Sequence, residues 1–480
     1  MSVATASPPG IAIDAVRAAQ RVWKAVSVRQ RLGVVGRFRE LLAENPAAIC
    51  VPMHRPPAET LAAEVLPLLD ACRFLERDAG RLLVPRRVGS WRRPLWLWGV
   101  RSEVRREPFG VVLIVGPGNY PLLLPGVQAL QALTAGNAVL LKPAPGGRAV
   151  ADAFSELVAR AGLPAGLLTV LPETVDSVAE ALAAGVDKVV LTGSAGVGRQ
   201  VLSQLADHLI PATMELSGCD AMFVLPDADL ELVSKALAFG LRWNGSATCI
   251  APRRVFVVAD RASDLERCLV QRLAATAPAA DHSAAARRAG ALIREALTEG
   301  ARLAAGSVLA DGITPCVVAD ARPTMRLLQE EVFAPVVTLA AVADASAALQ
   351  LAQASPYGLG ATVFGHPAAA WRLAADVQAG SVVVNDVIVP TVDPRLPFGG
   401  RGASGFGVTR GAEGLLEMTT VKVISERRGR LRAHLEPPPP DAAELFASYI
   451  RAVHGRSPGR LRAAWTLLRE LMRQGKRGQQ

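Results

Sequence analysis

The segment between residues 109 and 142 constrains the fold more than any other part of the chain. An apolar run, Val-Val-Leu-Ile-Val, is followed by a glycine-rich turn, a long apolar stretch of helical character and a second run, Ala-Val-Leu-Leu-Lys. Parallel strands that helices cover on both faces have this nearly continuous apolar character. Similar runs follow at residues 168–171, 188–191, 222–225 and 254–258. The chain is therefore predicted to be an α/β protein with a mostly parallel sheet.

A second block repeats this alternation from about residue 253 to residue 385, with strand candidates at 336–339 and 381–385. Before the first block, residues 11–83 have the apolar spacing of helices. A chain of 480 residues exceeds the size at which a single hydrophobic core stops growing, so at least two domains are expected. After Val423 the composition becomes basic and proline-rich, which places the best boundary at Glu426.

The net charge of +10 is concentrated in two segments. Residues 424–480 contribute +7 and residues 85–107 contribute +5, so the rest of the chain carries −2. A nucleic-acid-binding body would be basic over its surface. This distribution weakens a nucleic-acid-binding role for the whole protein and leaves only the tail for it, so no nucleic-acid partner is expected.

The cysteine pattern and the start of the chain indicate a reducing compartment. The six cysteines are dispersed without a Cys-x-x-Cys pair, which is unlike a zinc site or a disulfide framework, so no metal site is predicted. The first ten residues lack the basic and apolar regions of a secretory signal. The apolar region 109–141 is broken by two glycine-containing turns, so no membrane-spanning helix is expected there. The expected location is the cytoplasm, with membrane association as an open alternative.

Three motifs contain residues suited to nucleophilic catalysis. Cys249 lies in Asn-Gly-Ser-Ala-Thr-Cys-Ile-Ala-Pro, between a turn of small residues and an incipient strand. Glu215 lies in Met-Glu-Leu-Ser-Gly before a tight turn, and Asn119 lies in Gly-Pro-Gly-Asn-Tyr-Pro after the strand that begins at Phe109. Each has a plainer explanation when taken alone: an inert buried thiol, a solvated glutamate and a turn asparagine.

A glycine-rich turn, Thr-Gly193-Ser194-Ala-Gly-Val-Gly198, follows a predicted strand and opens a helix. The free N–H groups at such a helix start can hold a pyrophosphate, although the order is not Gly-x-Gly-x-x-Gly. Other punctuated segments are Lys142-Pro, Glu-Glu331-Val-Phe333-Ala-Pro, Tyr-Gly-Leu at 357–359, Asn385, and Pro-Phe-Gly-Gly at 397–400 followed by Ser404-Gly405.

In this order and spacing, these segments together resemble the aldehyde dehydrogenase superfamily over roughly residues 10–424. The short N-terminal region and the Leu-Pro-Phe-Gly-Gly segment are more similar to the dimeric and fatty-aldehyde branch. The resemblance implies a Rossmann-like dinucleotide-binding domain at 1–218, interrupted near 86–106 by a bridging or oligomerisation segment. It further implies an α/β catalytic domain at 219–390 and a small β oligomerisation arm at 391–424, with residues 425–480 left as a basic C-terminal extension.

The resemblance also implies NAD(P)-dependent oxidation of an aldehyde to a carboxylic acid. Cys249 resembles the nucleophile, Glu215 the general base, and Asn119 the oxyanion donor beside the Cys249 N–H. The thiolate adds to the carbonyl, hydride leaves for the nicotinamide, and Glu215 deprotonates the water that hydrolyses the thioester.

For the cofactor, NAD or NADP, Lys142 resembles the contact to the adenosine ribose. Gly193, Ser194 and Gly198 belong to the pyrophosphate turn, and Glu331 with Phe333 resembles the pair that positions the nicotinamide ribose. Two positions depart from the family pattern. Lys-Pro-Ala-Pro replaces the Lys-Pro-Ser-Glu of many NAD-preferring relatives, so a ribose-binding carboxylate is missing and Arg148 becomes a candidate partner for a 2′-phosphate. Cys219-Asp220 replaces a Gly-Gly-Lys turn, and the second thiol is interpreted as incidental.

Tryptophans and arginines alternate in the first basic segment, at Trp91, Trp96 and Trp98, a composition typical of membrane interfaces. The tail places two sets of residues on different faces of a predicted helix: Leu461, Ala464, Trp465, Leu468 and Met472 on one, and Arg462, Arg469 and Arg473 on the other. Peripheral membrane contact would favour a long-chain or isoprenoid aldehyde. The equal alternative is packing on the body or on the second subunit of a homodimer.

Two other functions compete with aldehyde oxidation. A CoA-acylating dehydrogenase or acyl reductase shares the thiol and the fold but generally lacks a base such as Glu215, because hydrolysis would waste its thioester. A catalytically silent binding member of the fold would have no reason to keep Cys249, Glu215, Asn119 and Glu331 together. Aldehyde oxidation is therefore favoured.

Overall fold

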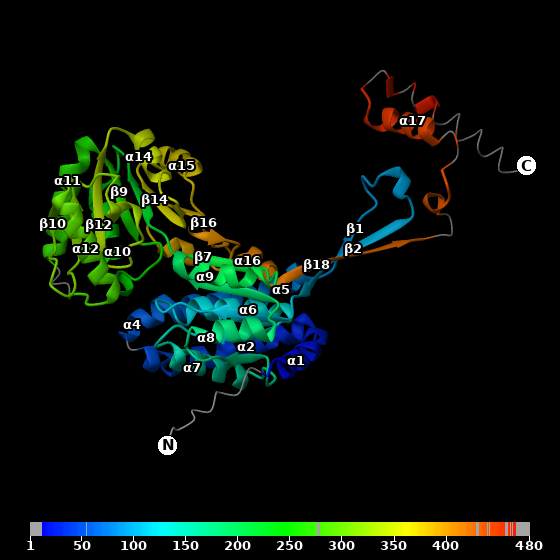
Figure 1. The fold of residues 1–480 in the computed structure, drawn as a ribbon, viewed down its shortest axis with the longest axis horizontal. Coiled ribbons are helices and arrows are strands. Elements are labelled where there is room, and N and C mark those ends of the chain that lie inside the picture. The colour runs from blue at the N-terminus through cyan, green and yellow to red at the C-terminus, as the bar shows by residue number, and fades with distance from the viewer. Residues whose placement is uncertain are drawn as a thin grey trace, which may run out of the picture. The chain divides into compact units, whose positions relative to one another are not determined.

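The computed structural model describes residues 12–53, 55–275, 279–428, 432–438, 440, 442–456, 459, 460, 462 and 464–466. The chain divides into two compact units. Unit 1 lies within residues 1–86 and 104–423, and unit 2 within residues 87–103 and 424–480. Unit 1 contains two large sheets, which are described in turn (Figure 1).

The first sheet has six strands in the order β17 (Gly405–Phe406), β7 (Ala212–Leu216), β6 (Lys188–Gly193), β3 (Val111–Val115), β4 (Ala138–Lys142) and β5 (Leu168–Val170). All neighbours are parallel except β17, which pairs antiparallel with β7. β3 and β4 are buried at every position, as their apolar runs predicted.

Helices around the first sheet share one large core with it. α2 begins with a capping box in which Ser27 and Gln30 satisfy each other's backbone donors, and α6 is buried at every position. In chain order these elements are α1 (Ile13–Ala25), α2 (Val28–Glu44), α3 (Ala47–Cys50), η1 (Val51–Met53), α4 (Pro57–Thr60), the π-helix η2 (Leu61–Val65), α5 (Leu66–Leu83), α6 (Leu123–Ala135), α7 (Arg148–Arg160), α8 (Asp176–Ala184), α9 (Ala195–Ala206) and α16 (Gly411–Glu417).

The second sheet has seven strands in the order β10 (Arg302–Ala305), β11 (Cys316–Ala319), β12 (Val336–Val342), β9 (Pro252–Val258), β8 (Asp220–Val224), β14 (Gly360–Phe364) and β15 (Ser381–Val384). Only its edge pair, β10 with β11, is antiparallel. The predicted α/β class with mostly parallel sheets is therefore confirmed.

Two hydrophobic clusters lie against the second sheet. One includes residues of α10 (Leu230–Arg242) and α11 (Ala259–Ala274), and the other includes residues of α12 (Ala284–Thr298), α13 (Arg326–Gln329), α14 (Ala345–Gln353) and α15 (Pro367–Asp376). The remaining elements of this part are η4 (Trp243–Ser246), η5 (Val389–Val392) and the short pair β13 (Tyr357–Gly358) and β16 (Arg401–Gly402). After the second sheet the chain returns to the first one to add β17 and α16.

Unit 2 is small and exposes large apolar side chains. A three-stranded sheet is formed by β1 (Arg86–Val88), β2 (Val100–Pro108) and β18 (Thr419–Arg427). The other elements are η3 (Leu95–Leu97), η6 (Ala433–Leu435) and α17 (Ala442–His454). Trp91 is 85% exposed and Trp98 80% exposed.

The predicted amphipathic tail helix is only partly described. Arg462, Ala464 and Trp465 are helical, and Trp465 is exposed. The other members of the two predicted faces, Leu461, Leu468, Arg469, Met472 and Arg473, lie outside the described residues. Of the helices that the structure describes, none is both long and apolar enough to cross a bilayer.

Candidate active site

Cys249 is presented by a backbone turn that is held in an uncommon conformation. Asn244, Gly245 and Ser246 in η4 all have positive φ angles, of 52°, 58° and 63°. Arg253 on β9 fixes this turn, since its Nη1 donates to Ser246 Oγ at 2.7 Å and to the Ala334 carbonyl at 2.6 Å. A backbone strained in this way persists only where its surroundings over-determine it. The loop before Cys249 is therefore rigidly anchored.

The Cys249 thiol is half-buried and its surroundings mostly oppose ionisation. Burial raises its pKa, and the negative charges of Glu215 and Asp220 raise it further, while Arg410 acts in the opposite direction. Burial also raises the pKa of Asp220, to about 8. The nucleophilic form of a cysteine is the thiolate. The resting thiol is thus protonated, and the cations around it determine how easily it ionises.

Glu215 is buried on β7, with only 3% of its surface exposed. Its Oε2 accepts a hydrogen bond of 2.7 Å from Thr409 Oγ1, and its Oε1 has no partner among the described residues. Burial raises its pKa, which Arg410 and the Thr409 hydroxyl partly offset. The plainer explanation of Glu215 as a solvated surface residue is therefore wrong.

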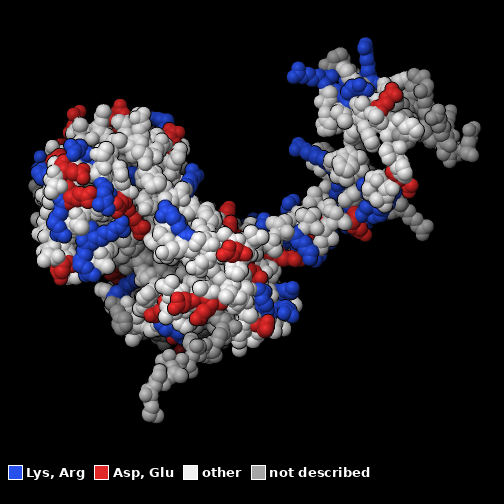
Figure 2. Space-filling view, in the orientation of Figure 1, with Lys and Arg blue, Asp and Glu red and all other residues white. Residues whose placement is uncertain are grey.

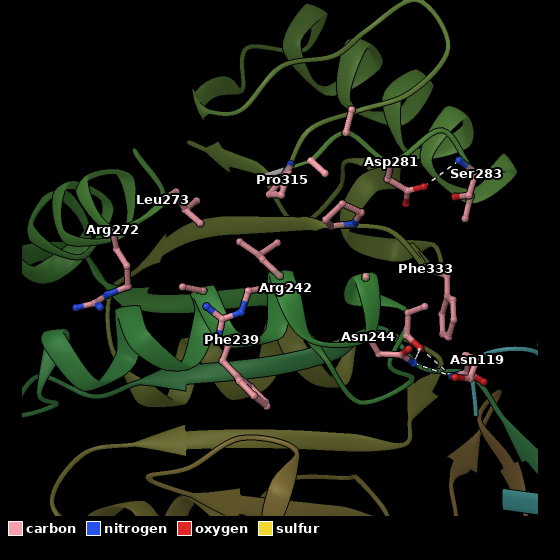
Figure 3. A pocket seen from close by; sticks show the side chains of 18 of the residues that line it. Asn119, Phe239, Arg242, Asn244, Arg272, Leu273, Asp281, Ser283, Pro315 and Phe333 are labelled. Carbon is pink, nitrogen blue, oxygen red and sulfur yellow. Dashed lines mark hydrogen bonds between the residues drawn. The ribbon is translucent and has the colours of Figure 1, made fainter. Parts of the chain in front are cut away.

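Asn119 follows β3 and lies against the Cys249 loop (Figure 3). Its Nδ2 donates to the Ala247 carbonyl at 2.9 Å, and its own carbonyl accepts from Asn244 Nδ2 at 2.9 Å. Tyr120 adds a second link, because its hydroxyl lies 2.8 Å from Thr248 Oγ1. The Asn119 amide is thus beside the Cys249 loop but engaged by the Ala247 carbonyl, so it would have to turn away from Ala247 to bind a substrate oxygen. Catalytic hydrogen bonds often form only once substrate is bound.

A buried ion pair between Arg55 and Glu64 holds the backbone of Asn119. Arg55 Nη2 donates to the Asn119 carbonyl at 3.0 Å and lies 3.2 Å from Glu64 Oε1. Glu64, which is completely buried, accepts from the backbone N–H groups of Leu122 and Leu123 at 3.0 and 2.7 Å. A carboxylate is favourable at a helix start, and here it caps α6, whose N-cap residue provides no side-chain bond. The pair therefore fixes the chain at Asn119 and at the start of α6 that follows it.

The expected dinucleotide residues meet at one edge of the first sheet. Lys142 ends β4 and Gly193 ends β6, and both strands run parallel to β3, which lies between them. Ser194 caps α9 by accepting from the Val197 N–H at 3.3 Å. The carboxyl ends of parallel strands are where α/β sheets bind ligands. Lys142 is nearly buried, which lowers its pKa, and it forms no hydrogen bond or ion pair with another described side chain.

Gly198 serves packing within α9. A Cβ atom at this position would lie 2.7 Å from Leu216 Cδ2, which is closer than real Cβ contacts occur. The glycine therefore allows α9 to pack closely on β7. This gives the residue a role that does not require contact with a cofactor.

Glu173 was missed by the sequence interpretation. It follows β5 and accepts from the backbone N–H of Gly146 at 3.1 Å and of Arg148 at 2.6 Å, and its charge interacts with Lys142. A carboxylate is thus present beside Lys142 although the Lys-Pro-Ala-Pro motif lacks one. The Arg148 guanidinium is paired with Asp152 at 2.8 Å, so it is not free to await a 2′-phosphate.

Glu331 and Phe333 lie between α13 and β12. The neighbouring Glu330 is engaged by Arg288 at 2.6 Å and Arg326 at 2.7 Å. Glu331 forms no ion pair with a described residue, and its charge reaches Cys219, which is buried. Glu331 is thus the carboxylate of this pair that is available to a ligand.

A cavity of about 1140 Å³ connects Asn119 to Phe333 (Figure 3). Its wall is mainly apolar, with Ala238, Phe239, Leu241, Leu273, Pro315 and Pro335. Charged side chains at the cavity are Lys235, Arg242, Arg272 and Asp281. Lys235 and Arg272 are both paired with Glu231, whereas Arg242 has no partner among the described residues.

Comparisons with known proteins identify the chain. The model of the aldehyde dehydrogenase family matches residues 1–424. The chain belongs to the aldehyde dehydrogenase family. The 4,4′-diapolycopene aldehyde oxidase of a Methylomonas species is 31% identical over 88% of this chain and 82% of the relative. A Mycolicibacterium smegmatis protein, provisionally named an NADP+-dependent succinate-semialdehyde dehydrogenase, is 32% identical over 95% of this chain and 92% of its own length.

Solved structures agree with this assignment to the aldehyde dehydrogenase family. The Mycobacterium tuberculosis aldehyde dehydrogenase complexed with NAD+ superposes with a TM-score of 0.78 at 28% identity, covering 86% of this chain and 89% of that one. The predicted family, fold and enzyme class are therefore confirmed. Figure 2 shows acidic side chains interspersed with basic ones over the visible face of this aldehyde dehydrogenase's unit 1, in line with its locally concentrated charge.

Proposed function

We propose that this aldehyde dehydrogenase oxidises a lipophilic aldehyde to its carboxylic acid through Cys249, with NAD or NADP as hydride acceptor. The observation that carries the proposal is that Asn119, from a separate chain segment, is hydrogen-bonded to the loop that presents Cys249. Asn119 is bonded to the Cys249 loop, and the charge of Glu215 acts directly on Cys249. The thiol, the amide and the buried carboxyl are the groups that acyl transfer through a thioester requires.

The chain's own residues perform the following steps. The Cys249 thiolate forms a bond to the aldehyde carbon, and the Asn119 amide and the Cys249 N–H stabilise the oxyanion. When bound, the dinucleotide supplies a hydride acceptor, and loss of hydride leaves a thioester on Cys249. Glu215 then takes a proton from water, whose oxygen attacks the thioester carbon. The C–S bond breaks and releases the carboxylic acid and the Cys249 thiolate, which can take back the proton held by Glu215.

The residues at the edge of the first sheet fit a dinucleotide. The α9 N-terminus follows β6 directly, as in other pyrophosphate sites, and Lys142 offers an unpaired ammonium group at the end of the adjacent β4. We place the ribose of the adenosine at Lys142, the pyrophosphate at Gly193 and Ser194, and the nicotinamide ribose at Glu331 and Phe333. Glu173 beside Lys142 would accept ribose hydroxyls and repel a 2′-phosphate.

The size and lining of the cavity support a lipophilic aldehyde as the substrate. Its volume of about 1140 Å³ slightly exceeds the range of about 300–1,000 Å³ for ligand pockets, and its walls are mainly aliphatic and aromatic. One relative is named a 4,4′-diapolycopene aldehyde oxidase, which is consistent with a cavity of this kind. A second candidate is a short aldehyde with a terminal carboxylate, which the unpaired Arg242 favours.

A substrate panel separates these two candidates. We expect kcat/KM to rise from short to long neutral aldehydes with the wild-type enzyme. Arg242→Gln should leave kcat/KM for these neutral aldehydes unchanged, because they have no charge with which the guanidinium could pair. If ω-carboxy aldehydes of four carbons are preferred and Arg242→Gln removes that preference, the lipophilic assignment fails. Loss of all aldehyde oxidation in Cys249→Ser with the fold intact tests the nucleophile itself.

We also propose that the exposed tryptophans of unit 2 contact either a second subunit or a membrane surface. Trp91, Trp96 and Trp98 are all exposed, and indole rings at a protein surface mark interfaces with membranes or subunits. Light scattering of the full-length protein tests the expected homodimer. Flotation with anionic liposomes tests the peripheral membrane contact, with a Trp91→Ser, Trp96→Ser, Trp98→Ser variant as the comparison. Flotation that is equal for both proteins would remove these tryptophans as membrane contacts.

A further inference from the structure

Arg410 is a buried cation that the proposed mechanism does not use. Only 7% of its surface is exposed, and it lies in the loop between β17 and α16. Removing a guanidinium from water is costly unless partners compensate it. Its position therefore calls for an explanation beyond packing.

The backbone at Arg410 adds to this cost. Its φ of 59° and ψ of 173° lie in a region that residues with a side chain rarely adopt. Such a conformation is energetically unfavourable and is found mainly at functional sites. A glycine would relieve the strain, so the side chain itself has a use at this position.

The Arg410 side chain is held firmly by two contacts. Its Nη1 donates to the Thr391 carbonyl at 2.8 Å, and its Cζ lies 4.3 Å from the centre of the Phe398 ring. Its Nε is buried and has no hydrogen-bond partner among the described residues. The guanidinium is thus fixed in direction while one of its donors stays open.

Arg410 interacts with the two groups that carry out the proposed chemistry. Its charge interacts with Glu215 and with Cys249, although no direct ion pair joins it to Glu215. The preceding residue, Thr409, donates to Glu215 Oε2 at 2.7 Å, which ties the same loop to the carboxylate. Glu215 Oε1 and Arg410 Nε are both buried, and neither has a hydrogen-bond partner among the described residues.

Among the charged groups around Cys249, Arg410 is the one that lowers the pKa of the thiol. Glu215 and Asp220 both oppose a thiolate. Arg253 also interacts with Cys249, but its Nη1 is occupied by Ser246 and Ala334 and its Nη2 by the Ser246 carbonyl. Around Glu215, the groups that act on its charge are Arg410 and Thr409.

We propose that Arg410 is a positioning residue of the active site, whose guanidinium is the cationic partner of both the Cys249 thiolate and the Glu215 carboxylate. The inference rests on the proposed roles of these two residues. One cation facing two acids favours the thiolate before the aldehyde adds. Once the thiol has become a neutral thioester, the same cation faces the Glu215 carboxylate alone and holds it ionised, ready to take a proton from water.

The test is the pH dependence of Cys249 alkylation in Arg410→Gln, measured without aldehyde or dinucleotide. Iodoacetamide labelling is quantified on the Cys249 peptide by mass spectrometry, because the chain has six cysteines. An opposite charge nearby typically changes a pKa by about one to three units. We expect the midpoint to rise by about one pH unit, so that alkylation at lower pH is about tenfold slower.

Two variants serve as controls. Arg410→Lys keeps the charge and should keep the midpoint within about half a pH unit of wild type. Arg395→Gln removes a positive charge from the same segment, but this arginine is exposed and paired with Asp393, so its midpoint should not change. Circular dichroism and the melting temperature verify the fold of each variant.

An unchanged midpoint in folded Arg410→Gln would overturn the proposal. If Arg410→Gln does not fold, the Arg410→Lys variant provides the test. A rise of its alkylation midpoint by a full pH unit, although the positive charge is retained, would contradict the charge argument. In turnover, the acidic limb of kcat should move to higher pH in Arg410→Gln, because Glu215 then ionises later. The alkylation result does not depend on aldehyde oxidation, so a failure of the proposed function remains distinguishable from a failure of this inference.

Discussion

Replacement of Glu64 by glutamine measures the cost of ionising the buried carboxyl behind Asn119. Burial raises its pKa from the ordinary value of 4.5 to about 7, although Arg55 and two backbone N–H groups act against the rise. Since each pKa unit corresponds to about 1.4 kcal/mol, ionising Glu64 in the folded state costs about 3 kcal/mol more than in the unfolded chain.

The sign of the pH dependence follows from this raised pKa. Below pH 4.5 the carboxyl is protonated in both states, so it has no differential effect. Between pH 4.5 and about 7 the unfolded chain releases the proton first, and the folded state therefore loses stability as the pH rises. The glutamine side chain of the variant has no proton to lose. The unfolding free energy of wild type minus that of Glu64→Gln should thus fall by about 3 kcal/mol between about pH 4.5 and 8.

Urea denaturation followed by circular dichroism at half-unit pH steps measures this difference. Glu156→Gln is the matched control, because Glu156 is exposed on α7 and its difference from wild type should be independent of pH. A difference between wild type and Glu64→Gln that is constant, or that grows with pH, would refute the reasoning.

Three further predictions concern single side chains. Asn119→Ala should lower kcat by about 10²–10³, the usual loss for an oxyanion donor, and a stopped-flow assay that finds kcat unchanged would remove Asn119 from that role. Glu173→Gln should raise kcat/KM with NADP relative to NAD, because a negative charge beside Lys142 is removed. An unchanged ratio in steady-state assays would show that the 2′-phosphate of NADP does not bind beside Glu173. Gly198→Ala should lower the unfolding free energy by about 1–3 kcal/mol, because the added Cβ meets Leu216 at 2.7 Å. Gly196→Ala in the same helix, where the nearest atom is 3.8 Å away, is its control in thermal unfolding, and equal losses would contradict the packing argument.

The strands were predictable because their signal is local. The apolar runs at 111–115 and 138–142 report burial on both faces directly, and both became fully buried strands. The carboxyl ends of these strands could then be inferred to share an edge. The grouping of Asn119, Lys142 and Gly193 followed from that rule together with the family resemblance.

The electrostatic surroundings of the site could not be read from the sequence. The bond from Thr409 to Glu215 joins residues 194 positions apart, and no periodicity reports such a contact. Arg410 stands in a glycine-rich segment where nothing local distinguishes it from a solvated arginine. Glu173 supplies a carboxylate beside Lys142 from another loop, so the motif that lacked an acid gave no hint of its replacement.

Because the chain returns to its first sheet only after the second one, the first sheet can be completed only late in synthesis. β17 joins β7 through Gly405, which pairs with Glu215, and Glu215 can accept its bond from Thr409 only after 194 further residues have been made. At about 5–20 residues per second, the ribosome needs roughly 10–40 s for that length. During this interval the nucleophile's loop can already exist while the groups around the base are absent. Chains released during this interval would lack both Thr409, which bonds Glu215, and Arg410, whose charge lowers the pKa of Cys249.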